Sequence, residues 1–272
     1  MTQLNRLVRL TIETDTTRRR LAADLRIQCQ GQTGTGGDDA YGFVAYNLAP
    51  TSVALLRDPT ARVTLTAGYR DGNVGIVAAG DVVRGSVRRK GAGEAGADVV
   101  VSWQVKPAQR ARSIRVRPRS YTAVTAGALL GDVIGDGGLA RGSIRLGQDT
   151  LHLRYVLRGT VGQALDRIAA DTGSAYRLTH GLLDVWPRNE SQTQRVQVIS
   201  PTSGMVGTPE PADDGGVEVR FLVRPPVRPG TLLDIRSDVV SGRYRVDALR
   251  LDVDSWEGPF YHVAQCAKER AT

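Results

Sequence analysis

The sequence has few of the side chains that commonly carry chemistry. Its 272 residues include two cysteines, three histidines and three lysines, and no two histidines stand at the spacing of a metal site. Cys29 and Cys266 lie far apart and neither is part of a CxxC pair, so we expect two buried free thiols. Aromatic residues make up 5% of the chain, so the core must consist mainly of Val, Leu, Ile and Ala. We expect no metal and no cofactor.

Long apolar runs are also missing. No window of about 18 apolar residues occurs, which excludes a membrane-spanning helix. Residues 1–20 lack the apolar block and the small-residue cleavage site of a secretory signal. We therefore expect a protein that is made and assembled in the cytoplasm.

The basic charge is carried mainly by arginine and is concentrated in the first part of the chain. Only Lys90, Lys106 and Lys268 are lysines among 36 basic residues, and the formal net charge is +8. Residues 1–120 hold 19 basic and 10 acidic residues, whereas the remainder is nearly balanced. Clusters at 18–20 and 88–89 fit phosphate contacts. An ordinary solvated surface is the favoured alternative, because no aromatic residues lie among these clusters to stack on bases.

The sequence offers no candidate catalytic site. No G-x-S-x-G motif marks a nucleophile. Asp213 and Asp214 fit the acidic residues of a turn better than a general acid–base pair. Asp252, Asp254 and Glu257 lack the glycine-containing loop of a calcium site. We predict that the protein is not an enzyme.

The three histidines are scattered. His152 alternates with two leucines in a predicted strand and is expected to face solvent. His180 falls in a turn and His262 in the last strand. None of them has a neighbour that would make it a metal ligand or a general base.

The period of the apolar residues divides the chain into three parts. Residues 1–118 and 194–272 alternate with the period of two that is typical of strands, and residues 119–193 contain helical periods. We predict a mainly β fold with an α+β insert, in which two small antiparallel β-barrels flank a helix-plus-sheet module. The predicted domains are an N-terminal barrel at 1–118, the module at 119–193 and a C-terminal barrel at 194–272.

Strands and turns of the first barrel follow from this alternation. The predicted strands are 7–12, 21–27, 63–69, 74–79, 82–87, 99–105 and 114–116, with turns at 70–73 and 91–93. The glycine-rich stretch 31–37 precedes neither a helical pattern nor a Lys-Ser/Thr pair, so it indicates a hairpin tip rather than a phosphate loop.

The module and the last barrel carry clearer signals. Thr125 can cap a helix that ends at Gly135, and Thr160 can cap a second helix with Gly173 just beyond its end. A hairpin follows, with strands at 175–178 and 182–186. The last barrel is predicted to contain five strands, at 196–199, 217–223, 232–235, 244–253 and 260–264, with a hairpin turn at 241–242.

Residues 200–230 hold an unusual density of turn-forming residues around one short apolar strand. Glycine or proline stands at 204, 207, 209, 215–216, 225–226 and 229–230. The stretch contains no His, Cys or Lys. Fixed loop geometry without reactive side chains is typical of assembly rather than catalysis.

Short motifs along the whole chain occur in an order that resembles the tail hub proteins of bacteriophages, which sit at the baseplate or tail tip. The first barrel carries Tyr-Asn-Leu at 46–48, Ala-Gly-Tyr at 67–69 and Gly-Asp at 80–81. Stretches 159–165 and 181–183 resemble the helical insert of that family, and 199–246 resembles its last barrel. The residues assigned to family motifs and assembly are Tyr46, Asn47, Leu48, Gly68, Tyr69, Gly80, Asp81, Gly204, Met205, Gly207, Pro209, Gly216, Val217, Pro225, Gly230 and Tyr244.

The resemblance implies a structural role in the virion tail. Such hubs form homotrimers whose six barrels join a sixfold tail tube to a threefold central spike and line the channel for the genomic DNA. The implied partners are further copies of the chain, a tail tube or distal tail protein, the spike protein, the tape measure protein and, transiently, DNA. One departure is the basic stretch 105–112, where the family carries an acidic turn.

Three other interpretations compete with this one. A nucleic-acid-binding protein built from OB-like barrels would also be arginine-rich and mainly β. A secretion-system component could contain a similar α+β module. Some hubs carry a peptidoglycan-cleaving insertion, but a chain of 272 residues has no room for one.

Overall fold

The computed structural model describes residues 6–21, 25–34, 39–70, 72–91, 98–179, 182–192, 196–212 and 215–269. These residues form a mainly β fold with an α+β part, as the sequence predicts. The chain divides into two compact units. Unit 1 comprises 1–33, 39–106 and 195–272, and unit 2 comprises 34–38 and 107–194. Both β regions of the sequence therefore belong to unit 1, and the domain boundaries at 118 and 193 stay a prediction.

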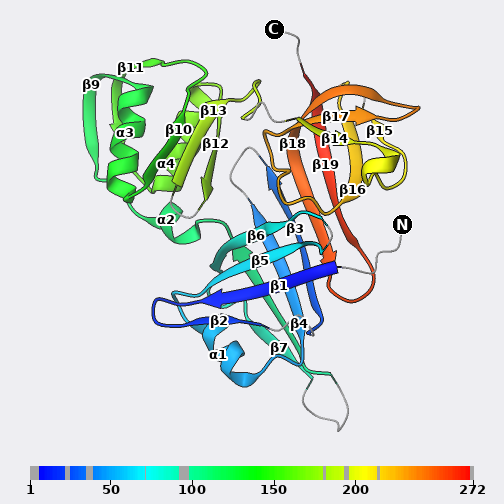
Figure 1. Ribbon diagram of the computed structural model, residues 1–272. Coiled ribbons are helices and arrows are strands. Elements are labelled where there is room, and N and C mark those ends of the chain that lie inside the picture. Colours follow the sequence, from blue (N-terminus) through cyan, green and yellow to red (C-terminus); the bar gives the residue numbers. More distant parts are fainter. Residues whose placement is uncertain are drawn as a thin grey trace. The chain divides into compact units, whose positions relative to one another are not determined.

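The first β region of unit 1 spans residues 6–106 (Figure 1). Its elements are β1 (Arg6–Glu13), β2 (Arg18–Arg20), β3 (Ile27–Gly34), β4 (Ala40–Tyr46), α1 (Pro50–Arg57), β5 (Arg62–Tyr69), β6 (Val74–Val82), β7 (Arg88–Lys90) and β8 (Val100–Lys106). The sequence does not predict α1. Pro50 begins this helix, where a missing N–H costs nothing, and Ser52, Val53 and Leu56 are buried beneath it.

Three strands predicted for the first barrel are wrong. In the predicted strand 21–27, Leu21, Leu25 and Arg26 lie outside strands, and only Ile27 belongs to one, as the first residue of β3. Residues 83–87 form a turn at Gly85 instead of continuing β6, and 114–116 form only one isolated bridge, between Arg115 and Thr160. Gly31 to Gly34, expected in a hairpin tip, belong to β3. Parts of other expectations lie outside the described residues: 22–24 of the second predicted strand, 35–37 of the hairpin tip, and Asp71, Ala92 and Gly93 of two turns.

The last β region spans residues 196–269 and contains all five predicted strands. Its elements are β14 (Val196–Ile199), the short 3-10 helix η1 (Pro201–Ser203), β15 (Glu210–Pro211), β16 (Val217–Leu222), β17 (Leu232–Arg236), β18 (Ser241–Asp254) and β19 (Phe260–Lys268). The turn predicted at 241–242 is wrong, because both residues lie in β18. The turn is instead formed by residues 237–240, between β17 and β18, where the Ser237 N–H donates to the Val240 carbonyl. Asp213 and Asp214 lie outside the described residues.

After β14, the first strand of the last β region, the chain crosses to β16, which lies on the other side of the β18–β19 hairpin. β14 pairs with β17, and the chain then turns through η1 so that Val206 donates to Arg220 of β16. Arg224, which follows β16, connects this strand to β14 and η1. Its guanidinium donates to the Val198 carbonyl at 2.8 Å and to the Ser203 carbonyl. Burial lowers the pKa of Arg224 below its usual value. The hydrogen bonds of the η1 turn and of Arg224 thus hold β14 and β16 together.

One sheet runs through both β regions, and we call its central path β8-β4-β3-β18-β19-β16 the shared sheet. In Figure 1 the orange β18 lies beside the blue β3. The 14-residue strand β18 contributes to two apolar cores: Tyr244, Val246 and Leu249 belong to the last core, whereas Leu251 and Val253 pack in the first. The β18–β19 hairpin therefore joins the two cores of unit 1.

Unit 2 is an α+β module. It contains α2 (Gln109–Ser113), β9 (Arg119–Thr125), α3 (Ala126–Gly137), β10 (Ala140–Ile144), β11 (Leu151–Leu157), α4 (Val161–Asp171), β12 (Ser174–Thr179) and β13 (Leu182–Pro187). Both predicted N-caps are confirmed, and Thr160 forms a complete capping box with Gln163. Helix α3 continues two residues past the predicted Gly135. The hairpin β12–β13 is confirmed, although its turn at His180 and Gly181 lies outside the described residues.

No helix within the described ranges is long and apolar enough to cross a membrane.

Candidate functional site

A polar hollow of about 530 Å³ lies on the shared sheet of unit 1. The sheet face that contains it points away from the apolar cores, because Gln28 and Gln30 alternate along β3 with the buried Ile27 and Cys29. The lining residues come from five neighbouring strands and adjacent turns: Gln28, Gln30, Gly42, Phe43, Val44, Ser86, Arg88, Ser102, Trp103, Gln104, Asp252, Val253, Asp254 and Pro259.

Asp254 holds one end of the hollow together. Its Oδ2 accepts hydrogen bonds from Arg26 Nη2 at 2.9 Å and from Gln28 Nε2 at 2.7 Å, and its Oδ1 accepts one from the Trp256 N–H at 3.0 Å. Burial alone would raise the pKa of Asp254, but these donors lower it below its usual value. The carboxylate thus stays charged and fixes the start of β3 to the end of β18.

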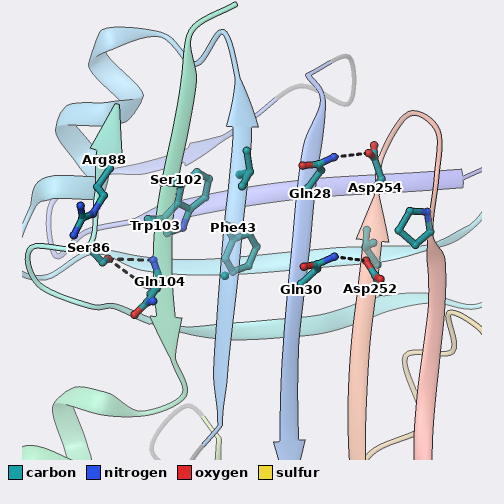
Figure 2. Close-up of a pocket in the computed structure, with 14 residues that line it drawn as sticks. Gln28, Gln30, Phe43, Ser86, Arg88, Ser102, Trp103, Gln104, Asp252 and Asp254 are labelled. Carbon is teal, nitrogen blue, oxygen red and sulfur yellow. Dashed lines mark hydrogen bonds between the residues drawn. The ribbon is translucent and has the colours of Figure 1, made fainter. Parts of the chain in front are cut away.

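A second row of hydrogen bonds crosses the same face, as Figure 2 shows. Gln30 Nε2 donates to Asp252 Oδ1 at 3.1 Å, parallel to the bond between Gln28 and Asp254. On the other side of the hollow, the Gln104 N–H donates to Ser86 Oγ at 3.1 Å. Amide and hydroxyl groups therefore supply most of the polar surface.

The polar groups of this hollow are mostly neutral. Arg88 is its cation, Asp252 and Asp254 are its carboxylates, and its other polar groups are neutral. Both carboxylates already accept hydrogen bonds from glutamines. Within the described residues, no three His, Cys, Asp or Glu side chains gather closely enough to hold a metal ion. The hollow offers neither an activated nucleophile nor a matched acid–base pair.

The titratable groups that could react are buried on the core side. Cys29 and Cys266 are buried free thiols, as predicted, and burial raises the pKa of both. His262 lies in β19, and burial lowers its pKa to about 3. Its Nδ1 accepts a hydrogen bond from the Arg224 N–H at 3.3 Å. These side chains serve packing.

The expectation that His152 faces solvent is wrong. Its side chain is partly buried against Tyr155, with 5.0 Å between the ring centroids. Its Nε2 is shielded from solvent and has no hydrogen-bond partner in the described part of the chain.

The motif residues of the first β region lie in turns and in the core, outside the hollow. Asn47 has a positive φ of 53° and its side chain bonds both Asp98 and the Val99 N–H, so it fixes the chain between β4 and α1. Gly68 is required by close packing, because a Cβ there would lie 2.1 Å from the Asn73 carbonyl oxygen. The other motif residues of this region are Tyr46 at the end of β4, the buried Leu48, Tyr69 against Phe260, Gly80 in β6, and the buried Asp81, which bonds Arg62.

The motif residues of the last β region also shape the backbone. Gly204 has a φ of 99° at the end of η1, and Met205 bridges to Phe221 of β16. Gly230 donates its N–H to the Val246 carbonyl at 2.7 Å. The remaining ones are Gly207 in a turn, the buried Pro209, Gly216 before β16, Val217 in the core, Pro225 against Gly75, and the buried Tyr244 of β18. Their assigned role in assembly stays a prediction.

Sequence reasoning missed the glutamines of the hollow. The stretch Ile-Gln-Cys-Gln at 27–30 and the stretch Leu-Asp-Val-Asp at 251–254 both alternate strictly between apolar and polar residues. This alternation could have indicated two strands with one polar face. It could not have indicated that the two strands pair, because 222 residues separate Gln30 from Asp252.

The fold, but not the sequence, is similar to known proteins. No family model and no curated protein matches the sequence. The tail protein from Neisseria meningitidis is similar over 96% of each chain, with 12% identity and a TM-score of 0.64. The 43 kDa tail protein of prophage MuSo2 from Shewanella oneidensis is similar over 96% of each chain, with 9% identity and a TM-score of 0.63.

A third similar structure comes from a secretion apparatus. It is a component of the type VI secretion system of Escherichia coli that itself has structural similarity to tail proteins of bacteriophage T4. The match covers 98% of the present chain and 74% of that one, with 9% identity and a TM-score of 0.57. The predicted resemblance to phage tail hub proteins is therefore confirmed as a likeness of fold.

Proposed function

We propose that this protein is a structural hub of a phage tail, at the baseplate or tail tip, and that it acts as a homotrimer. The three copies form a ring that joins a sixfold tail tube to a threefold spike and lines the channel for DNA. The observation that carries this proposal is the shared sheet, in which β8, β4 and β3 of the first β region continue into β18, β19 and β16 of the last.

Symmetry explains why one chain would contain two such regions. A sixfold ring is continued by six near-equivalent surfaces, and three chains with two β regions each supply six. The shared sheet gives every chain a continuous wall instead of two separate blocks. The fold likeness to two phage tail proteins over 96% of the chain supports this arrangement.

The polar face of the shared sheet suits the inside of a channel through which DNA must move. This face carries carboxylates as well as cations: Glu218, Asp252 and Asp254 lie among Arg88, Lys106, Arg220 and Arg250. A strongly basic wall would retain phosphates by releasing counterions, and the affinity would fall steeply with salt. We infer that contact with DNA is transient and that the arginine surplus faces protein partners.

The proposed partners follow from this position. A tail tube or distal tail protein continues the ring on one side, the spike protein closes it on the other, and the tape measure protein occupies the channel before DNA leaves. The protein would be assembled in the host cytoplasm and end in the virion tail.

The mass of the purified protein in solution tests the proposal. Native mass spectrometry of the protein alone is expected to give three times the mass of the 29.3 kDa chain, and a larger complex that contains three chains is expected when tail tube protein is added. A persistent monomer that binds single-stranded DNA with micromolar affinity or tighter would contradict it and favour the nucleic-acid-binding alternative.

A charged variant sharpens the same test. The double variant Gln30→Arg and Gln104→Arg adds two cations to the polar face, so the assembled ring is expected to retain single-stranded DNA in a salt-sensitive manner. Ser120→Arg and Thr122→Arg add the same charge at exposed positions of unit 2 and serve as the control. Equal retention by both double variants would contradict a channel role for the shared sheet.

A second candidate is the same hub role in a secretion apparatus. The fold likeness to the type VI secretion component over 98% of the chain favours it. Assembly with tube protein from a phage tail, and not with tube protein from a secretion system, distinguishes the two.

A further inference from the structure

Strands β9 and β11 of unit 2 form a two-stranded ribbon with an unusual residue at its centre. Arg154 has a φ of 53°, yet the pairing of β11 with β9 keeps the same register before and after this residue. This conformation is costly for a residue with a Cβ. It reverses the alternation of β11, so that Tyr155 and Leu157 pack on the core while Leu153 and Val156 face outward.

The reversal leaves a row of apolar side chains exposed on β11. Leu151 is 61% exposed, Leu153 71% and Val156 47%. The strand also has a free edge: within the described residues, β11 pairs with β9 on one side and with no strand on the other. Proteins normally protect such an edge with charge, a bulge or a covering element, because unpaired N–H and C=O groups accept another strand.

A hollow of about 590 Å³ lies along this edge and is basic. Arg154 and Arg158 line it from β11 and the residue that follows the strand, and Arg167 lines it from α4. No carboxylate lines the hollow, and across the described part of the chain these three arginines form no ion pair. His152 and Tyr155 also line it, and the His152 Nε2 and Tyr155 hydroxyl are shielded and have no hydrogen-bond partner among the described residues.

We propose that the free edge of β11 binds an extended segment of a partner protein as an added strand, and that this segment alternates acidic and apolar residues. Main-chain hydrogen bonds would complete the ladder, and the apolar residues would cover Leu151, Leu153 and Val156. The acidic residues would pair with Arg154, Arg158 and Arg167, whose guanidinium groups suit carboxylates.

Charge excludes the same edge of a second copy as the occupant. Two β11 strands laid antiparallel would bring Arg154 and Arg158 of one copy against the same cations of the other. The leucines exposed along the strand disfavour single-stranded nucleic acid, because aliphatic side chains offer the bases no stacking surface. This inference concerns unit 2 alone and does not depend on the proposed role in a phage tail.

Synthetic peptides and the full chain test the inference. The probe is an eight-residue peptide that alternates valine and glutamate, and the comparison peptide has lysine in place of glutamate. The acidic peptide is expected to bind at least tenfold more tightly than the basic one. A third peptide replaces two central valines by proline and is expected to lose the binding, since proline cannot donate to a strand ladder.

Variants of the chain locate the binding. Leu153→Asp and the pair Arg158→Glu with Arg167→Glu are each expected to weaken the acidic peptide at least tenfold. Arg141→Glu changes an exposed arginine of β10 outside the hollow and is expected to bind normally. Hydrogen exchange of residues 151–157 is expected to slow when the acidic peptide is bound. Circular dichroism of every variant establishes that it is folded.

Several outcomes would overturn the inference. They are no binding of the acidic peptide, equal binding of the acidic and basic peptides, retention of binding by folded Leu153→Asp, and exchange protection elsewhere than β11. Tighter binding of an eight-nucleotide thymidine oligomer, lost in the arginine variants, would assign the hollow to nucleic acid instead.

Discussion

The two β regions of unit 1 build similar alternating strands but complete their packing by different means. The first uses a helix, α1, whose Val53 and Leu56 cover its core, and an aromatic pair, Phe43 and Trp103, stacked at 5.3 Å. The described residues of the last region contain no α-helix. It uses the η1 turn and the bridging guanidinium of Arg224. Two regions of one sheet can thus be completed by apolar packing in one case and by hydrogen bonding in the other.

The comparison also shows that neither region is independent. The hairpin β18–β19 places Leu251, Val253 and Phe260 in the first core and Val246 and Cys266 in the last. A disturbance of either core is therefore transmitted to strands that serve the other.

The largest expected effect comes from emptying either core. Trp103→Ala and Phe221→Ala each remove a large side chain that is at most 2% exposed, and each is expected to cost about 3–5 kcal/mol of unfolding free energy. Because the hairpin is shared, unit 1 should unfold in one transition in both variants. Urea denaturation followed by hydrogen exchange in β4 and in β16 measures this.

Trp256→Ala is the control, since that tryptophan is 59% exposed and its loss should change stability little. Two separate transitions, one for each β region, would show that the cores are independent and would contradict the comparison.

Acid is expected to weaken the last β region through His262. Burial keeps its folded-state pKa at about 3, so between pH 3 and 6.5 the unfolded chain binds a proton that the folded chain does not. Stability should fall as the pH decreases through this window, by about 2 kcal/mol from pH 7 to pH 5.

His262→Gln should remove this slope, and thermal unfolding from pH 7 to pH 5 checks it. Asp254 contributes a separate loss at lower pH, because its lowered pKa stabilises the fold only above the unfolded value of 3.8. An unchanged slope in the glutamine variant would mean that His262 is protonated in the folded protein.

A smaller effect is expected from the edge of the last β region. Arg224→Met removes the two hydrogen bonds to the carbonyls of Val198 and Ser203 and should cost about 1–3 kcal/mol. Amide exchange should accelerate in β14 and β16 but not in β4. Arg243→Met, an exposed residue of β18, is the matched control. Equal destabilisation by the two variants would assign no special role to Arg224.

Local patterns in the sequence predicted much of this fold. Alternation predicted the five longer strands of the last β region, and Thr125 and Thr160 predicted both helix starts of unit 2. Helix α1 was missed because its eight residues are too few to display a helical period within a strand-rich stretch. The false strand at 82–87 ends at Gly85, whose positive φ of 75° turns the chain away from β6.

These local patterns could not predict which distant strands pair, or where a strand changes its conformation. Pairing of β3 with β18, which creates the polar hollow, depends on residues more than 200 positions apart. The reversal at Arg154 depends on a backbone conformation that arginine rarely adopts, so regular alternation predicted the wrong side for His152. Periodicity describes a strand's neighbours in sequence, whereas the site depends on its neighbours in space.

The most direct measurement is an electron cryomicroscopy reconstruction of the purified protein bound to tail tube protein. A ring of three chains around an open passage is predicted, with Gln28, Gln30 and Gln104 of every copy facing that passage. A ring in which this face is turned outward, or a particle without a central passage, would contradict the account.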